Sequence, residues 1–346
     1  PRAGVDKVTD EYRTFLGLCS HEYFHTWNVK RIKPELFTPY ELERETHTQL
    51  LWAFEGITSY YDDLALARCG LVTPDSYLEL LGQTMTRVYR GSGRSKQSVA
   101  ESSFDAWTKF YKQDENAPNA IVSYYTKGAL VALALDLTLR ERSEGAVCLD
   151  DVMAALWERH GQTGIGVSEE GVEALAAEIS GLDLEAFFDQ AVRGTEDLPL
   201  TELLATVGVD LQFRPAESAA DKGGKPASQS AEELARRGDP GLRLAANGEA
   251  RVAYVREGGA AHQAGLAAGD TIVAVDGLKA TAANLEKLAG GYAPGTTIPV
   301  HAFRRDELMT FELTLQAPPV DTCVLTLQEQ PAEAALQRRQ HWLKQA

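Results

Sequence analysis

Residues 20–34 have the sequence SHEYFHTWNVKRIKP, and the interpretation of the whole chain starts from this stretch. His21 and His25 are four positions apart, so on a helix both imidazoles project from one face, about one turn apart. Two histidines in that arrangement can bind one metal ion. Glu22 follows the first histidine, where its carboxylate can take a proton from a zinc-bound water. The stretch therefore predicts a zinc-binding helix with Glu22 as general base.

The flanking residues favour a packed, uninterrupted helix. No proline occurs between Leu16 and Trp27, and Glu22 is the only formally charged residue there. A carboxylate among apolar neighbours is costly unless it has a hydrogen-bond partner or a catalytic role. A metal-bound water supplies the partner and also the role, which is proton transfer. The alternative is a chance motif whose histidines only satisfy hydrogen bonds in a core.

A third ligand must come from elsewhere in the chain, and Glu55 is the best candidate. It lies in a segment, residues 46–68, whose apolar side chains recur at helical spacing. Gly56 follows it at a position where helix propensity argues against glycine, which indicates close approach of another backbone. The alternative for Glu55 is a solvated helix charge. Two imidazoles and a carboxylate suit zinc, so one Zn²⁺ per chain is expected.

This pattern resembles the glycyl aminopeptidase family of gluzincin metallopeptidases, whose members end in a PDZ domain. The resemblance rests on residues 20–34, 51–61 and 123–128, and it spans most of residues 11–145. In that family the ligand glutamate follows the second histidine by about thirty residues, as Glu55 follows His25 here.

The resemblance implies roles for further residues. Tyr125 matches a tyrosine whose hydroxyl donates to the oxyanion while water attacks the peptide carbonyl. Tyr124 is the alternative donor, although the spacing to Lys127 favours Tyr125. For both tyrosines the other interpretation is an aromatic ring packed at a helix start, and Lys127 is expected to be structural.

The expected function is zinc-dependent hydrolysis of peptide bonds, in the manner of an aminopeptidase that removes glycine or alanine from the amino terminus of peptides. The family also has an amino-terminal β-rich domain and a Gly-x-x-Glu type motif that holds the substrate amine. Neither occurs between Pro1 and His21, so the chain is expected to bind zinc without being a competent aminopeptidase. Two alternatives stay open: a metalloendopeptidase tethered to a PDZ domain, and a non-catalytic PDZ adaptor with a vestigial metal site.

Composition narrows the classes of partner. A net charge of −16 disfavours binding to nucleic acid or to anionic lipid, and no apolar run approaches a membrane span. The four cysteines are far apart, which predicts reduced thiols and favours the cytoplasm. The chain begins at Pro1, so a signal peptide on an earlier segment stays open, and oligomeric state is not predicted.

The expected fold class is multidomain α+β: a mainly helical, thermolysin-like catalytic domain followed by a small β-rich PDZ domain. Helices are expected over residues 74–90, 124–142, 149–160, 168–180 and 183–194. Asp150, Ser168 and Asp183 are the expected N-caps, and residues 91–120 are expected to be loops. The expected divisions are a catalytic domain at 1–205, a linker at 206–238, a PDZ domain at 239–318 and a tail at 319–346.

The PDZ prediction rests on residues 264–277, AGLAAGDTIVAVDG, and on strand-like runs divided by glycine turns. The expected peptide-binding loop, whose backbone amides hold a peptide C-terminus, is Gly241, Leu242, Arg243 and Leu244. Residues 284–288 are expected to form the helix across the groove, and residues 333–344 a terminal helix that docks on the body. The alternative for this domain is a packing module that only buttresses the catalytic domain.

Overall fold

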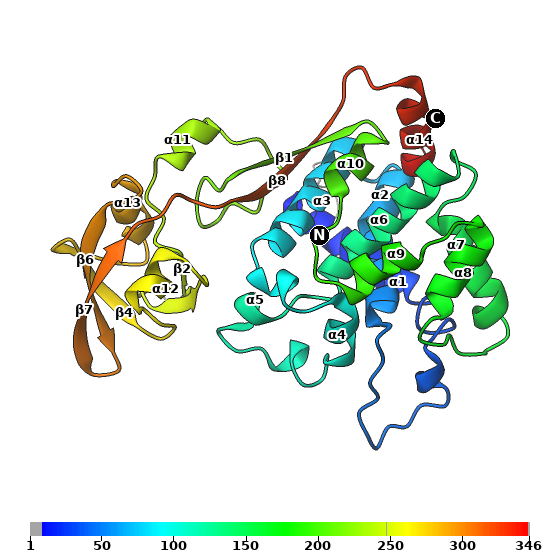
Figure 1. Cartoon of the computed structure of the whole chain (residues 1–346), viewed down its shortest axis with the longest axis horizontal. Helices are drawn as coiled ribbons and strands as arrows, with labels where there is room; N and C mark the ends of the chain where they lie inside the picture. The colour runs from blue at the N-terminus through cyan, green and yellow to red at the C-terminus, as the bar shows by residue number, and fades with distance from the viewer. Residues whose placement is uncertain (1–8, 247, 345–346) are drawn as a thin grey trace.

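The computed structural model describes residues 9–246 and 248–344, so the outermost residues of the expected catalytic domain and tail lie outside it. A helical body and a smaller β-rich part lie side by side, joined by two extended segments (Figure 1). This arrangement confirms the expected fold class. No helix among the described residues is long and apolar enough to cross a membrane.

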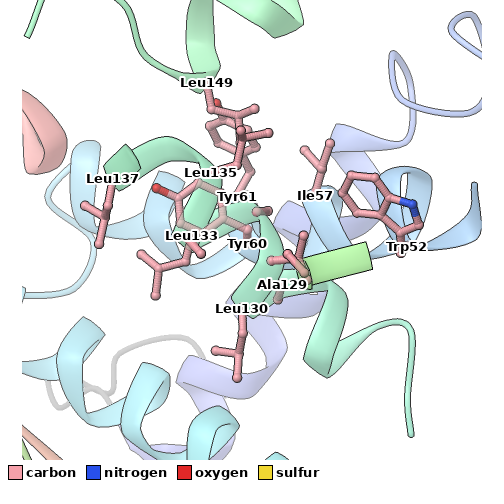
Figure 2. Close-up of a cluster of buried hydrophobic side chains, with 14 of the residues drawn as sticks. Trp52, Ile57, Tyr60, Tyr61, Ala129, Leu130, Leu133, Leu135, Leu137 and Leu149 are labelled. Atoms are coloured by element: carbon pink, nitrogen blue, oxygen red, sulfur yellow. The ribbon is translucent and has the colours of Figure 1, made fainter. Parts of the chain in front are cut away.

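The centre of the body is α6 (Thr126–Arg142), a helix that is apolar around nearly its whole circumference and almost completely buried. Helices α2 (Ile57–Arg68) and α3 (Pro74–Tyr89) pack against it, and α1 (Asp10–Phe24) packs on α2. Figure 2 shows the core that results, in which leucines of α6 meet Ile57, Tyr60 and Tyr61 from α2. This core places α1 and α2 side by side, and the site is built on these two helices.

The body is completed by shorter helices of three kinds. The α-helices are α4 (Val99–Phe104), α5 (Ala117–Ala120), α7 (Leu149–Leu156), α8 (Gly171–Ser180), α9 (Glu185–Phe188) and α10 (Leu200–Ala205). The 3₁₀ helices are η1 (Glu35–Phe37), η3 (Ser92–Ser95) and η4 (Phe110–Lys112). The π-helices are η2 (Trp52–Gly56), η5 (Trp157–Gly161) and η6 (Asp189–Arg193).

The expected helices occur, but several details of the prediction are wrong. The helix expected from residue 46 begins near Leu51, and α8 begins at Gly171 rather than at residue 168. Residues 91–120 contain α4 and α5 and are not loops throughout. The N-caps are Cys148, Glu170 and Leu184. Asp150 does not cap because its carboxylate instead accepts hydrogen bonds from Tyr61 and Arg68.

Segments on both sides of the PDZ domain return to the helical body. Strands β1 (Val209–Pro215) and β8 (Val320–Leu327) pair antiparallel, with Val209 opposite Leu327, and pack on α3. Helix α14 (Glu333–Leu343) follows and buries Trp342, whose indole N–H donates to the Tyr60 hydroxyl at 2.8 Å. Strand β1 therefore occupies part of the stretch expected as a linker, because its side chains join the body's core.

The β-rich part has a hydrophobic core of its own. It contains two sheets, with strand orders β2-β3 and β5-β4-β6-β7. Its elements are β2 (Leu242–Leu244), β3 (Val252–Val255), α12 (Ala260–Ala264), β4 (Thr271–Val275), β5 (Leu278–Lys279), α13 (Leu285–Gly290), β6 (Thr297–Arg304) and β7 (Glu307–Thr314). The short helix α11 (Ala231–Ala235) precedes it and is held by a capping box between Ser230 and Glu233.

Candidate metal centre

Helices α1 and η2 bring the three expected ligands together. His21 and His25 project from the last turns of α1, and their Nε2 atoms are 3.1 Å apart. The Oε2 atom of Glu55 is 3.3 Å from Nε2 of His21 and 3.1 Å from Nε2 of His25. Three atoms that carry lone pairs therefore converge on one point.

The chemistry of this cluster fits a divalent metal ion. Oε2 of Glu55 is buried and accepts no hydrogen bond from the described residues, which is costly for a carboxylate oxygen. Two imidazole nitrogens that face each other are satisfied together only if a proton or a cation lies between them. Two histidines and one carboxylate form a donor set that zinc prefers, with a position left for water.

The other nitrogen of each imidazole is held by a neighbouring acceptor. Nδ1 of His21 lies 3.2 Å from a carboxylate oxygen of Asp62 on α2. Nδ1 of His25 donates to the backbone carbonyl of Asn28 at 2.8 Å. An acceptor at Nδ1 fixes the tautomer in which Nε2 keeps its lone pair, and it also orients the ring. Both rings are thus oriented with Nε2 toward Oε2 of Glu55.

The charges of the cluster shift its pKa values in opposite directions. Burial lowers the pKa of His21, but the contact with Asp62 and the nearby carboxylate of Glu55 outweigh it and raise this pKa to about 9. Burial raises the pKa of Glu55, yet the two histidines outweigh it and lower this pKa to about 2. The carboxylate of Glu55 is therefore ionised at neutral pH, as a metal ligand must be.

Glu55 lies in a π-helix, and Asn28 stabilises that unusual backbone. The Nδ2 atom of Asn28 donates to the carbonyl of Ala53 at 3.0 Å, and it lies 3.2 Å from the carbonyl of Phe54 and from Oγ1 of Thr58. A π-helix shifts the usual hydrogen-bond register and is frequent at functional sites. The side-chain amide of Asn28 thus contacts the backbone that carries Glu55, and its backbone carbonyl accepts a hydrogen bond from His25. Asn28 therefore connects two of the three expected ligands.

Gly56 lets the ligand helix approach the centre of the body. A Cβ atom added at Gly56 would lie 2.5 Å from the carbonyl carbon of Gly128 on α6, closer than real contacts allow. The backbones of η2 and α6 therefore touch at this pair of glycines, as the sequence predicted for Gly56. This contact fixes the depth at which Glu55 lies.

Three tyrosines gather beside the cluster. The rings of His21 and Tyr125 are stacked, with centroids 6.3 Å apart. Tyr124 is buried, and its hydroxyl donates to that of Tyr111 at 3.2 Å. The hydroxyl of Tyr111 lies 3.3 Å from that of Tyr125. Tyr125 is thus the tyrosine nearest the histidines, whereas the Tyr124 hydroxyl is engaged with its neighbour.

The remaining expected residues lie in two other places. Glu22 is exposed on α1 next to His21, and it makes no ion pair with another described residue. Residues Gly241–Leu244 are far from the cluster in the fold and line a cavity between the PDZ domain and the body. They are not a loop throughout as expected, because Leu242–Leu244 pair with β3 and form strand β2.

Sequence reasoning missed Asp62, Asn28 and Tyr111. Asp62 carried a usable signal, because it follows Glu55 by seven residues, or two helical turns, and so shares its face. Asn28 carried a weaker one, as a polar residue directly after an apolar helix. Tyr111 carried none, because a short segment 14 residues away from Tyr125 brings it to the site.

Both parts of the chain are similar to known proteins. Residues 14–131 match the M61 glycyl aminopeptidase family, and residues 251–289 match the PDZ domain. An aminopeptidase N family protein from Idiomarina loihiensis has a crystal structure that aligns with a TM-score of 0.91 at 45% sequence identity. The alignment covers 99% of this chain but 57% of that one, so this chain spans little more than half of that protein.

A serine endoprotease from Yersinia pestis matches 25% of this chain and 30% of its own length, at 30% identity and a TM-score of 0.23. No curated protein matches the chain. The family matches cover the helix pair that carries the metal cluster and the strands beyond it. The chain therefore carries an M61 glycyl aminopeptidase domain followed by a PDZ domain.

Proposed function

We propose that this chain is a zinc-dependent peptidase of the aminopeptidase type that removes small residues, glycine or alanine, from peptide amino termini. The observation that carries the proposal is the convergence of Nε2 of His21, Nε2 of His25 and Oε2 of Glu55 within 4.8 Å of one another. The family match to a glycyl aminopeptidase supports the reaction class and the small residue.

Zinc, when bound, polarises a peptide carbonyl and makes water acidic enough to attack at neutral pH. His21, His25 and Glu55 would hold it. The exposed carboxylate of Glu22 takes the proton of the attacking water and delivers it to the leaving amine. Glu22 can do both because it is beside the ligand His21 but is not part of the ligand cluster.

Tyr125 is the proposed donor to the oxyanion. Burial, followed by its contact with Tyr111, raises the pKa of Tyr125 well above its ordinary value, so its phenol keeps its proton at neutral pH. A protonated phenol beside the metal can donate a hydrogen bond that strengthens as negative charge develops on the carbonyl oxygen. Tyr111 holds that hydroxyl in place.

Peptide binding at the PDZ domain is a second proposed function. Strand β2 pairs only with β3 among the described residues, so its other edge is free to add a peptide strand. Helix α13, Gly241 and strand β2 itself line one cavity. This combination supports a binding role over a purely packing one.

The test measures metal content and hydrolysis on the same preparations. The wild-type chain should hold about one zinc, which His21→Ala should lose. Glu22→Gln should keep the zinc and lose hydrolysis of glycyl and alanyl peptides by at least about a hundredfold. Glu202→Gln, at an exposed position on α10, is the matched control and should change neither.

Acetylation of the peptide separates the candidate activities. An aminopeptidase should leave acetylated peptides intact, whereas an endopeptidase should cut both forms at the same rate. Zinc binding without hydrolysis of either form would favour the adaptor with a vestigial site. Absence of zinc from the wild-type chain would contradict the proposal outright.

A further inference from the structure

A cavity of about 750 Å³ lies between the PDZ domain and the helical body. Its PDZ wall contains Gly241, strand β2 and Leu285 of α13. Its opposite wall contains Arg87 of α3 and residues 117–123, which lead directly to the tyrosines of the metal site. A peptide in the PDZ groove would therefore touch both parts of the protein.

The cavity is rich in arginine, which is unusual in a chain with a net charge of −16. Six arginines and three carboxylates line it: Arg87, Arg90, Arg94, Arg237, Arg243 and Arg256, with Asp239, Glu286 and Asp321. Each carboxylate already has an arginine partner, in the pairs Asp239–Arg256, Glu286–Arg237 and Asp321–Arg90. Arg94 pairs with Asp197.

Arg87 and Arg243 are the two lining arginines that form no ion pair with any described residue. Arg243 is half-buried, and its side chain donates only to the backbone carbonyl of Ala219, at 2.7 Å. Burial, and then repulsion from Arg90, lowers the pKa of Arg243. A partly desolvated guanidinium without an anion is unfavourable, and a carboxylate ligand would offset this.

The two walls are held in place before any ligand arrives. The side-chain amide of Asn119, in the body, donates to the carbonyl of Val255 on β3 at 2.9 Å. Its Oδ1 atom accepts from the Tyr254 hydroxyl at 2.9 Å and from the Glu257 backbone N–H at 3.0 Å. Lys96 adds an ion pair with Glu257. A preformed site binds more tightly because less order must be imposed on binding.

The last helix of the chain lies outside this cavity. Helix α14 packs on α2, where Trp342 is fully buried and its carbonyl accepts from Arg68 at 2.9 Å. Helix α14 therefore does not occupy the cavity.

We propose that this cavity is a composite site for the acidic C-terminal end of a peptide, read by both parts of the protein. The terminal carboxylate lies at Gly241, where the chain enters strand β2, beside Arg243, and an acidic side chain near the terminus pairs with Arg87 of the catalytic domain. The proposal rests on the peptide-binding function of the PDZ domain, and it adds a specificity-determining residue that lies outside that domain.

The test uses the full chain and a fluorescein-labelled octapeptide that ends in Glu-Asp-Val, followed by fluorescence anisotropy. The amino-terminal label also blocks removal of the first residue. Two altered probes are compared: the same peptide with an amidated C-terminus, and one that ends in Gln-Asn-Val. We expect each to bind at least about tenfold more weakly, because each loses a charge-assisted pair.

Variants assign each pair to its arginine. Arg243→Gln should weaken binding by about tenfold, and amidation of the peptide should then have little further effect. Arg87→Gln should weaken it by a similar factor, and should abolish the preference for Glu-Asp-Val over Gln-Asn-Val. Lys287→Gln, which removes a charge from α13 outside the cavity, is the matched control and should bind as the wild type does.

Each contrary result has a distinct meaning. Failure of every probe to bind would overturn both the peptide-binding function and the composite site. Binding that depends on Arg243 and the terminal carboxylate, but is indifferent to Arg87→Gln, would overturn the composite site and leave the PDZ function standing. Thermal unfolding of each variant, and the altered probes on the unaltered protein, separate these outcomes from loss of folding.

Discussion

The metal centre and the interdomain cavity are both lined by charged groups, but they hold those charges differently. At the metal centre each ligand atom faces the others, and each histidine is also held by an acceptor, Asp62 or the Asn28 carbonyl. In the cavity two arginines have no carboxylate partner among the described residues. The first region is fixed by the fold, whereas the second is completed by a ligand.

This difference has a physical origin. Glu55 lies on η2, which packs against the most buried helix, α6, and His21 lies on α1, which packs on α2, so a shift of either helix disturbs the main core. The cavity lies between two separate cores that touch through polar contacts such as those of Asn119. Substitutions at the metal centre should therefore affect stability more strongly than those in the cavity.

The largest effect on the free energy of unfolding is expected for Gly56→Ala. The new methyl group would meet the Gly128 backbone at 2.5 Å, so η2 and α6 must separate. We expect a loss of about 3 kcal/mol in the free energy of unfolding, the upper end of the usual range for overpacking, together with weaker zinc binding. Gly291→Ala, which has no clash, is the control in urea denaturation. Equal stability of the two variants would contradict the tight packing.

Asn28→Ala should have the next largest effect. It removes the buried Nδ2 donor from the carbonyl of Ala53, while the carbonyl of Phe54 keeps the Thr58 hydroxyl as a donor, and the loss corresponds to about 2 kcal/mol. Zinc affinity should fall too, because the side-chain amide of Asn28 contacts the backbone of η2, which carries Glu55. Gln229→Ala, at an exposed position, should leave both denaturation and zinc titration unchanged. A stability loss with unaltered zinc affinity would show that Asn28 does not position the ligands.

Asp62→Asn should weaken zinc binding by about tenfold to a hundredfold while the protein stays folded. The carboxylate orients His21 through Nδ1, and the amide is a weaker acceptor of the same shape. Burial, and then the neighbouring Asp62, raise the pKa of Asp63 to about 7, so the comparison is made above pH 8. There Asp63→Asn removes the adjacent charge without touching a ligand, and it separates orientation from simple loss of negative charge. Zinc competition titration with a chelator measures both, and equal losses would favour the charge explanation.

A smaller effect on stability is expected for Asp221, in the segment that connects the helical body to the PDZ domain. Burial raises the pKa of Asp221, but bonds from Arg214 and from nearby backbone N–H groups outweigh it and lower this pKa to about 2. The folded-state pKa is below its ordinary value, so the stabilisation is complete above about pH 4 and is lost as pH falls toward 2. It should amount to about 1 kcal/mol after allowance for solvent screening.

Asp221→Asn tests this expectation, since other carboxylates titrate in the same range. The difference in unfolding free energy between wild type and variant should be present at pH 6 and should shrink as the pH falls through the interval from about 4 to 2. A difference that does not vary with pH would show that the ion pair with Arg214 is not its source.

The smallest effect is expected for Arg87→Ala in the cavity. The side chain is exposed and forms no ion pair with a described residue, so the free energy of unfolding should change by less than about 0.5 kcal/mol. A large loss would show that Arg87 has a structural partner, and the contrast between the two regions would fail.

Much of the fold could be predicted because the signals are local. Periodic apolar residues marked α3, α6 and the strands β3 and β4, and the glycine turns marked the PDZ domain. The π-helices could not be predicted in this way, because a single shifted turn has nearly the same apolar spacing as an α-helix. The N-caps were wrong for a related reason: Asp150 is a good cap by type, but its partners Tyr61 and Arg68 come from another helix.

The sequence by itself determined the ligand chemistry, because four-residue spacing on a helix places His21 and His25 on one face whatever surrounds them. It also determined that Glu55 stands beside a glycine that permits close packing. Only the tertiary structure decided that Asp62, Asn28 and Tyr111 reach the site, and that two unpaired arginines face one cavity. Those contacts join residues far apart in the chain, and they exist only once separate hydrophobic cores have brought their elements together.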